Sequence, residues 1–456
     1  MASNDTSLVP YGAAMRDRFL CDPFFLNLNH GSFGTYPLAV RNVLRQYQDQ
    51  VEGRPDPFIR YNTPKELDKS RDAVAKLLNV PRDECVFVKN ATTGVATVLQ
   101  NLPFESNDVI IHFETVYGAV EKGIASLVES RPAQIRKVHY EMPVSHEELV
   151  ERFLDVVKAA RREGFNVKIA IFDVITSLPA VRFPFERLTQ VCREEGILSL
   201  IDGAHGIGQI PLDLGHLQPD FFASNCHKWL FVPRGCCVLY IPKRNQHLIR
   251  TTLPTSWGYI PPPDGPKTAP SIMQSDDANK TAFESLFEFV ATSDDTPYFC
   301  VPAALEFREK VCGGEEKIYA YLETLAKEAA DIVAAALGTE VMQEPNLKPG
   351  EESQLRRCGM STVRLPITTR VELARGTDSA VLLSPGEGGA VVDWFQRRIT
   401  ERYGTFLPLV EHGGWLWVRL CAQVYLEKKD FEWAAQVLKE VCAQFAAERA
   451  REKSRL

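Results

Sequence analysis

The chain has 456 residues, of which 45% are hydrophobic and 24% are charged, so it can bury a large core and form one big domain with a smaller one. Its net charge of -7 argues against a nucleic-acid-binding protein, which needs a concentrated basic face. No run of about 18 apolar residues is present, which argues against a membrane-spanning segment.

Eleven cysteines occur without a CxxC pair. This usage fits buried, reduced thiols better than disulfides or a zinc site. The N-terminal segment, Met1 to Tyr11, is polar and lacks the apolar stretch of a signal peptide. We therefore expect a cytoplasmic protein without a bound metal.

In the first two thirds of the chain, short apolar runs alternate with amphipathic stretches, a pattern typical of helices that cover a mainly parallel sheet. The pattern predicts helices at Pro64–Leu78, Ala91–Gln100 and Pro184–Glu195. The predicted strands are Glu84–Val88, Val109–Phe113, Ile169–Val174, Leu198–Asp202, Phe221–Ser224 and Cys236–Tyr240. The proline-rich stretch Ile260–Pro270 predicts a surface loop.

From about Cys300 onward the pattern predicts a second, smaller α+β domain. Its predicted elements are helices at Ala303–Val311, Lys317–Leu337 and Asp430–Arg449, and strands at Ser361–Pro366 and Trp415–Ala422. Asn346–Gln354 and Arg375–Gly389 are predicted loops, and Arg449–Arg455 a solvated tail. We expect three parts: residues 1–40 as an N-terminal segment at the mouth of a site, 41–300 as the large α/β domain, and 301–456 as the small domain.

Ligands of open parallel sheets bind at the carboxyl ends of the strands, so the residues that follow the apolar runs are candidates for a site. Thr92 and Thr93 follow the first run at the start of a helix, whose free backbone amides could hold a phosphate, although an ordinary helix cap is an alternative. Tyr117 follows the next run and could stack on a flat ring, or simply pack. Thr176 and Ser177 follow the third run. Their hydroxyls could bind a ligand at this edge or could have a purely structural role.

Asp202 ends an apolar strand, and an ionised carboxylate there needs a cationic partner. His205 follows three residues later; a metal site built on these two side chains lacks a third ligand at a familiar spacing. His227 and Lys228 follow the run Phe221 to Ala223 and precede Trp229, a poor setting for a surface lysine.

A lysine and a buried aspartate are the two groups that a pyridoxal phosphate (PLP) enzyme needs. The lysine forms a Schiff base with the ring aldehyde and moves the substrate α proton, and the aspartate keeps the pyridine nitrogen protonated. On this interpretation Lys228 and Asp202 take these roles, His205 contacts the ring 3-oxygen, and Ser224 and His227 help to hold the phosphate. The sequence thus predicts an enzyme of amine chemistry.

Four strings carry a family resemblance: Asn27 to Pro37, Ile201 to His205, Ser224 to Leu230 and Trp417 to Leu420. They resemble the class V aminotransferase family of fold type I PLP enzymes, in its isopenicillin N epimerase-like branch. Further strings, Arg54 to Tyr61, Arg244 to Arg250 and Gln423 to Glu427, are similar to fungal ergothioneine-pathway lyases, which cleave the C–S bond of hercynylcysteine sulfoxide. The resemblance runs from about residue 19 to residue 442.

The resemblance implies roles position by position. Lys228 matches the Schiff-base lysine, Asp202 the pyridine partner and Tyr117 the ring-stacking residue, with Tyr117 and His30 also assigned to the catalytic group. Arg419 matches the arginine that binds the substrate α-carboxylate. The remaining matches are Asn29 and His30 at the substrate mouth, Ser177 with the cofactor, and Thr292 reaching the partner's phosphate in a homodimer with sites at the interface.

Two departures concern the substrate. Similar lyases carry a reactive cysteine in the segment aligned with Arg136 to Val138, and this chain has none there. They also carry a histidine where this chain has Trp257, which enlarges the apolar area of the pocket and removes an acid or base.

The leading hypothesis is a PLP-dependent lyase that expels a β sulfur group from an amino acid. Within the same family, the alternatives are a decarboxylating ring closure of the loline (pyrrolizidine) type, epimerisation and transamination. From a different class, a non-catalytic scaffold has no need of Lys228, Asp202 and Arg419 together.

Overall fold

The computed structural model describes residues 7–266, 268, 280–375 and 380–453. Predicted features that extend beyond these ranges, the last residues of the 260–270 loop, the start of the 375–389 loop and the end of the C-terminal tail, lie partly outside them. Within the described residues, no helix is both long and apolar enough to cross a bilayer.

A seven-stranded, mainly parallel sheet forms the centre of the large domain, with strand order β1-β7-β6-β5-β4-β2-β3. The strands are β1 (Cys85–Val88), β2 (Asp108–Phe113), β3 (Gln134–Val138), β4 (Asn166–Asp173), β5 (Leu198–Asp202), β6 (Phe221–Asn225) and β7 (Cys237–Tyr240). Only β7 runs antiparallel to its two neighbours. The predicted α/β architecture is confirmed, and each predicted strand of this sheet is present.

In this sheet one strand escaped prediction, the edge strand β3. Its sequence, Gln-Ile-Arg-Lys-Val, has no apolar run because most of it is only half-buried and lies at the end of the sheet. Charged side chains on an edge strand also discourage pairing with other chains.

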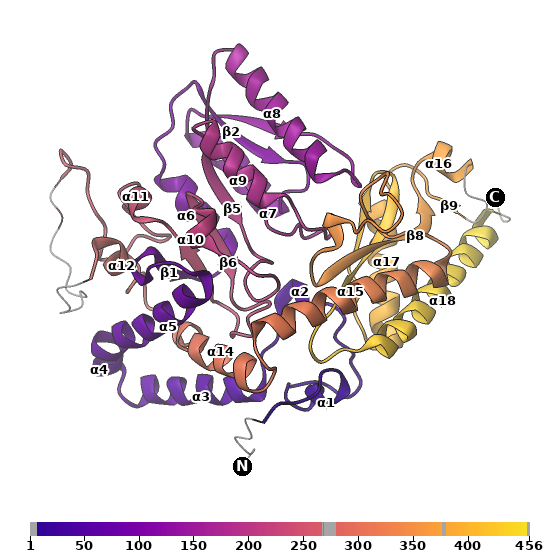
Figure 1. The fold of residues 1–456 in the computed structure, drawn as a ribbon, viewed down its shortest axis with the longest axis horizontal. Helices are drawn as coiled ribbons and strands as arrows, with labels where there is room; N and C mark the ends of the chain where they lie inside the picture. Colours follow the sequence, from indigo (N-terminus) through magenta and orange to yellow (C-terminus); the bar gives the residue numbers. More distant parts are fainter. Residues whose placement is uncertain (1–6, 267, 269–279, 376–379, 454–456) are drawn as a thin grey trace.

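Helices cover both faces of this sheet (Figure 1). One buried cluster packs α6 and α7 on one face, and a second, larger cluster packs α8 and α9 on the other and continues into the small domain. The helices up to the end of the sheet are α1 (Ala13–Arg16), α2 (His30–Phe33), α3 (Leu38–Gly53), α4 (Pro55–Pro57), α5 (Thr63–Leu78), α6 (Ala91–Asn101), α7 (Gly118–Ser130), α8 (His146–Arg162), α9 (Phe185–Glu194), α10 (Leu214–Leu217) and α11 (Lys243–Gln246). Short helical turns lie at Phe58–Asn62, Arg82–Glu84 and Gln354–Arg356.

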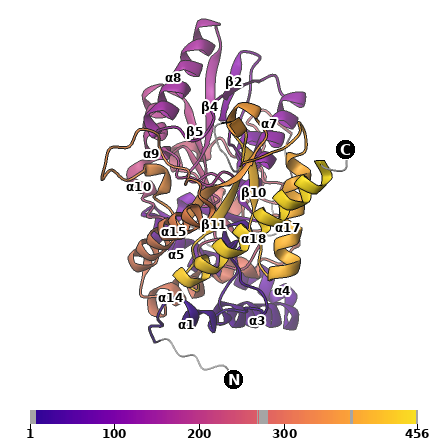
Figure 2. The ribbon, with the colours of Figure 1, turned by 90° about the vertical axis from the view of Figure 1, so that its right-hand side faces the viewer.

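The small domain is built on a four-stranded sheet with order β10-β11-β8-β9. Its strands are β8 (Met360–Thr368), β9 (Val381–Leu382), β10 (Leu409–His412) and β11 (Trp415–Cys421). The helices that follow the large sheet are α12 (Ala282–Leu286), α13 (Thr296–Phe299), α14 (Val301–Lys310), α15 (Glu315–Leu337), α16 (Val371–Arg375), α17 (Gly388–Tyr403) and α18 (Lys428–Lys453). The long helices α15 and α18 lie side by side against this sheet (Figure 2).

The N-terminal segment joins the two domains. Its backbone pairs with the small domain at Leu26 and Thr405, and Phe19 pairs with Pro37 before α3. Helix α14 packs on α3 and α5 of the large domain, whereas α15 packs on the small sheet. The chain therefore changes domain between α14 and α15, near the predicted boundary at residue 301.

Candidate active site

The strands β4, β5 and β6 end next to one another, with Asp173, Asp202 and Asn225 as their last residues. Asp173 and Asp202 are direct partners in the parallel register, and both are buried. Asn225 ends the adjoining strand β6, and Lys228 lies three residues later. The acid and the lysine of the predicted site therefore lie at one edge of the sheet.

Lys228 is half-buried, and its Nζ lies 3.1 Å from Nε2 of His205. Within the described residues no carboxylate forms an ion pair with it. Burial, and then the positive charge of Arg419, lower the pKa of Lys228 to about 8, against the opposing pull of Asp202. An amine of this pKa is a competent nucleophile and base near neutral pH.

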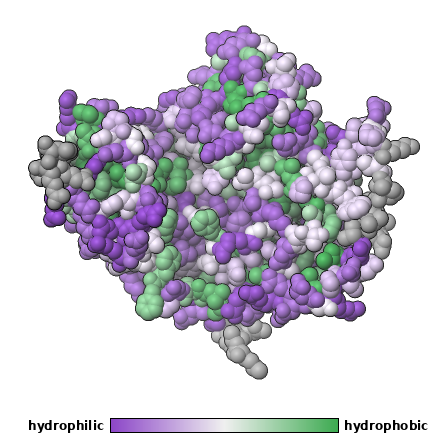
Figure 3. Space-filling model, turned by 180° about the vertical axis from the view of Figure 1, so that it is seen from behind, coloured by the Kyte–Doolittle hydropathy of each residue, from purple (hydrophilic) through white to green (hydrophobic). Residues whose placement is uncertain are grey.

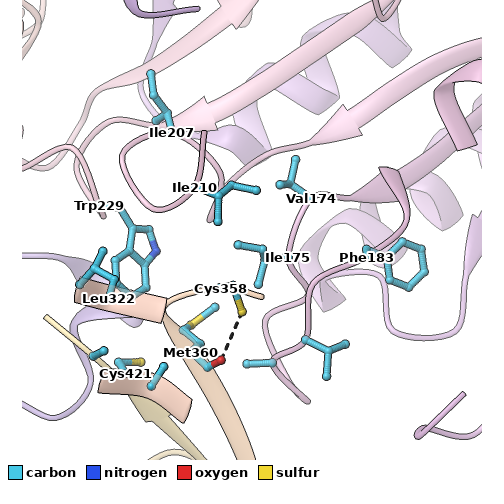
Figure 4. Packing of buried hydrophobic residues seen from close by; sticks show 14 of the residues in the cluster. Val174, Ile175, Phe183, Ile207, Ile210, Trp229, Leu322, Cys358, Met360 and Cys421 are labelled. Carbon is cyan, nitrogen blue, oxygen red and sulfur yellow. Dashed lines mark hydrogen bonds between the residues drawn. The ribbon is translucent and has the colours of Figure 1, made fainter. Parts of the chain in front are cut away.

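The ring of His205 links Lys228 to the core. The indole Nε1 of Trp229 donates to its Nδ1 at 3.2 Å, so a neutral ring carries its proton on Nε2, the atom that faces Lys228. Burial and the charge of Lys228 hold the pKa of His205 well below its usual value. Trp229 itself lies among Ile207, Leu322 and other apolar side chains of both domains (Figure 4).

Asp202 accepts one hydrogen bond, from the backbone N–H of Ala204 at 2.9 Å. Burial raises its pKa, and Lys228 opposes that effect. A buried carboxylate with a single donor and no cation in contact fits a protonated ring nitrogen as its partner.

Arg419, in the middle of β11, is buried and forms no ion pair within the described residues. Its Nη1 donates to the carbonyl of Ser177 at 2.9 Å, and its Nη2 to Asn29 Oδ1 at 2.6 Å and Ser32 Oγ at 2.8 Å. Its Nε is buried without a partner in the described part of the chain. A buried guanidinium without an acid needs an anion, and its fork matches a carboxylate. Asn29 and Ser177 thus contact this arginine directly.

The start of α6 faces the same strand edge. Asn90 caps the helix by accepting from the Thr93 N–H at 2.8 Å, and the Ala91 N–H donates to Asn225 Oδ1 at 2.8 Å. The cap that the sequence left as an alternative is therefore Asn90. In this cap the N–H and the hydroxyl of Thr93 both donate to Asn90, whereas the exposed Thr92 stays available to an anion.

One predicted phosphate contact, Ser224, differs in this structure, and a second, His227, keeps one ring nitrogen open. The Ser224 hydroxyl is buried, donates to the Gly203 carbonyl and accepts from the Ile207 N–H, so it braces the sheet end and has no donor left for a phosphate. His227 donates from Nδ1 to the Cys236 carbonyl at 2.9 Å, and burial lowers its pKa to about 4. Its Nε2 has no partner among the described residues.

His30 was expected among the catalytic groups, and the structure corrects this. The ring is fully buried; Nε2 contacts the Lys228 carbonyl at 2.7 Å and Nδ1 the Tyr425 hydroxyl at 2.9 Å. Burial lowers its pKa to about 4. With both nitrogens occupied, His30 positions the lysine backbone and has no atom free for proton transfer.

Three predicted site residues are exposed: the ring-stacking Tyr117, the substrate-pocket Trp257, and Thr292, which is predicted to reach the partner's phosphate. A cavity of about 140 Å³ near Thr292 is lined by Thr93, Leu253 and Ala291, among others. Through this cavity the start of α6 adjoins the 252–254 and 290–293 segments, although the single chain buries none of Tyr117, Trp257 and Thr292.

Sequence reasoning missed Asp173 and Asn225. Both directly end an apolar run, the same signal that identified Asp202, so the strand-end rule would have found them if applied to the last residue of every strand. All eleven cysteines are free thiols, ten of them buried. Within the described residues no cluster of three or more potential ligands is arranged to hold a metal.

Comparisons with known proteins show which family the chain is similar to. A family model described as aminotransferase class-V matches residues 39–256. The chain is 45% identical to the L-cysteine desulfhydrase-like protein lolT1 of Epichloe uncinata, over 96% of this chain and 97% of that protein. It is 31% identical to the hercynylcysteine sulfoxide lyase of Schizosaccharomyces pombe, over 97% and 100% of the two chains.

Solved structures share the fold at low sequence identity. A C-DES mutant with glycine covalently linked to its PLP cofactor superposes with a TM-score of 0.70 at 17% identity, covering 93% of this chain and 98% of that one. A cysteine desulfurase from Thermococcus onnurineus has a TM-score of 0.67 at 17% identity, covering 96% and 100%. These matches confirm the predicted fold.

Proposed function

Because the chain belongs to the class V aminotransferase family and has its fold type I architecture, we propose that it is a PLP-dependent lyase that cleaves the C–S bond of an amino acid. One observation carries the proposal: the half-buried Lys228 feels the charges of the buried Arg419 and the buried Asp202, and neither cation has an acid in ion-pair contact within the described residues. The two cations offer a nucleophilic amine and a carboxylate-binding group at one site. The names of the relatives, an L-cysteine desulfhydrase-like protein and a hercynylcysteine sulfoxide lyase, support the reaction class.

The donor set fits the cofactor. Lys228 would hold PLP covalently through Nζ, Asp202 would face its ring nitrogen, and the N–H of His205 Nε2 would reach its ring oxygen. The start of α6, with Thr92 and Thr93, and the side chains of Asn225 and His227 would hold the phosphate. When bound, PLP supplies an electron sink for the charge that develops beside the substrate amino group.

The chain's own residues would bind the substrate, move the proton and hold the lysine in place. Arg419 fixes the substrate α-carboxylate and thereby orients the α C–H bond. Lys228 Nζ takes the α proton, and the sulfur leaves with the electron pair of the C–S bond. His30 and Trp229 keep the lysine and His205 in place through hydrogen bonds to the Lys228 carbonyl and to His205 Nδ1.

The proposal also assigns roles to Tyr117, Trp257 and Thr292. Tyr117 would stack on the ring, Trp257 would face the substrate, and Thr292 would reach the phosphate of a partner subunit. We propose a homodimer on the basis of large apolar side chains left exposed on the single chain, among them Phe24, Phe33, Tyr61 and Trp257. Hydrophobic residues also form patches among hydrophilic ones on the face in Figure 3. The free thiols favour a cytoplasmic location.

A second candidate is the decarboxylating ring closure named above. It is favoured by the segment Arg136 to Val138, where similar lyases carry a reactive cysteine. Here Lys137 forms ion pairs with Glu121 at 2.6 Å and Glu114 at 3.7 Å, so this chain has a charged cluster where those lyases have a reactive thiol.

The test is a product assay by mass spectrometry with purified protein, PLP, and a panel of cysteine, cysteine conjugates and hercynylcysteine sulfoxide. A keto acid, ammonia and a released sulfur compound are expected, with none from Lys228→Ala. Release of carbon dioxide without sulfur would favour the second candidate. A protein that shows no visible absorption band with PLP would refute both.

A further inference from the structure

Asp173 is a buried acid that the proposed chemistry does not use. It ends β4 directly beside Asp202 at the end of β5, and the two residues are partners in the parallel register. Side chains at partner positions of adjacent parallel strands project from the same face, with strands about 4.8 Å apart. The two carboxyl groups are therefore neighbours at the edge of the sheet, 4% and 2% exposed.

The two acids are not equivalent. Asp202 accepts the Ala204 N–H, whereas the carboxyl group of Asp173 has no hydrogen-bond or ion-pair partner within the described residues. The next backbone N–H along the chain, that of Val174, donates to the Asp202 carbonyl. A buried carboxylate without a donor or a cation is strongly disfavoured, so of the two acids Asp173 is the one that keeps a proton.

The charged and titratable groups around the pair support this order. Lys228 on the β6 side is the cation whose field reaches both acids, and Arg419 lies beyond it and acts on Lys228. On the β3 side Tyr140 is within the field of Asp173, but its hydroxyl pairs with Thr115 Oγ1 at 2.6 Å. Burial, and then the charge of Asp202, hold the pKa of Asp173 well above its usual value. The two remaining neighbours, Cys237 and His205, stay uncharged because burial raises the pKa of the thiol and lowers that of the ring.

We propose that Asp173 is a positioning residue of this site: it remains a neutral carboxylic acid beside Asp202, so the two acids together carry one negative charge instead of two. One charge matches one ring cation, and the neutral Asp173 leaves the Asp202 carboxylate as the anion that faces that cation. The protonation state of the two acids is inferred independently of the proposed function. The role of this protonation state in holding the cofactor rests on the proposed function.

The test uses thermal unfolding of the full chain, as purified and after removal of PLP, between pH 4.5 and 8.5. An acid that is neutral in the folded state and ionised in the unfolded state lowers stability increasingly as pH rises above its unfolded pKa of about 4. Asp173→Asn removes that loss, so its Tm should exceed the wild-type value by roughly 2 °C or more at pH 8 and approach it at pH 4.5.

Asp108→Asn is the matched control. Asp108 is also a buried aspartate at a strand end, but it pairs with Lys168 at 2.8 Å, and its pKa is lowered. Its replacement should therefore lower the Tm near neutral pH, the opposite sign. A lower or unchanged Tm of Asp173→Asn at pH 8 would overturn the proposal.

Two further measurements do not depend on that variant's stability. The infrared spectrum of the wild-type protein at pH 7 should contain the carbonyl stretch of a protonated carboxylic acid; its absence would also overturn the proposal. PLP affinity should fall at least about fivefold in Asp173→Ala and be restored in Asp173→Asn, since the amide is neutral like the protonated acid. An Ala variant that binds PLP like the wild type would remove the positioning role, whereas a wild-type protein that binds no PLP would refute the proposed function and leave the stability test valid.

Discussion

Nε2 of His205 lies 3.1 Å from Nζ of Lys228. Because Trp229 donates to the opposite ring nitrogen, the neutral imidazole points an N–H at the lysine. That arrangement suits an amine with a free electron pair and disfavours an ammonium group. The hydrogen bond and the burial of Lys228 therefore act in the same direction.

The first prediction concerns the pH dependence of PLP incorporation. Only the neutral amine attacks the aldehyde, and the pKa of Lys228 is lowered to about 8. The rate should fall about tenfold for each pH unit below 8 and level off above it. Stopped-flow absorbance on PLP-free protein measures this, with N-acetyl-lysine as the control for the ionisation of PLP. A rate that keeps rising to pH 10 would show an unperturbed lysine.

The second prediction concerns Trp229. Trp229→Phe keeps an aromatic ring but removes the donor to His205 Nδ1, so the imidazole can move its proton and accept from an ammonium group. The midpoint of PLP incorporation should rise by about half a unit to one unit, the effect of one hydrogen bond. Trp394→Phe, on α17 of the small domain, is the matched control. An unmoved midpoint in Trp229→Phe would contradict the tautomer assignment.

The third prediction tests the carboxylate site. Arg419→Lys keeps the charge but loses the planar fork and its bonds to Asn29, Ser32 and Ser177. The cost of about 2 kcal/mol in substrate binding corresponds to a fall of about 30-fold in kcat/KM, mostly through KM. Arg397→Lys, at an exposed ion pair within α17, should leave the kinetics unchanged. Steady-state kinetics decide between a rise in KM and a loss of kcat alone; the latter would place the carboxylate elsewhere.

The fourth prediction concerns Gly34, whose φ is +65° and whose backbone lies against His227 and Lys228. An added Cβ would lie 1.8 Å from the His227 carbonyl oxygen, so Gly34→Ala must displace the lysine segment. Gly164→Ala is the control, since its φ is +88° and an added Cβ meets nothing within 4 Å; it should cost only about 1 kcal/mol of stability. Gly34→Ala should lose clearly more in thermal unfolding and retain PLP poorly. Equal Tm losses in the two variants would refute the close approach.

The sequence predicted the large sheet well because its strands are buried on both faces and therefore read as apolar runs. It missed β3, whose edge position permits charged residues. Asp202 and Lys228 were identifiable because each interrupts or directly follows an apolar stretch, where burying a charge is costly. Arg419 was predicted through family resemblance, since neither its neighbours nor its spacing distinguish it from other buried strand residues.

The roles of individual groups were less predictable. His30 was expected in catalysis through the family resemblance, but the partners that occupy both its nitrogens, the Lys228 carbonyl and the Tyr425 hydroxyl, come from segments about 200 and 400 residues away. Ser224 and Asn225 are adjacent in sequence, and the alternation of side chains along β6 decides which faces the core and which faces the start of α6.

By itself the sequence determined the fold class and the acid and lysine of the site, because burial and strand length leave a one-dimensional pattern. Only the tertiary structure decided that Asp173 adjoins Asp202, that Trp229 orients His205, and that the N-terminal segment supports Lys228. Those relations depend on strand register and on contacts between distant segments, and no local pattern of residues records which distant group fills a hydrogen bond.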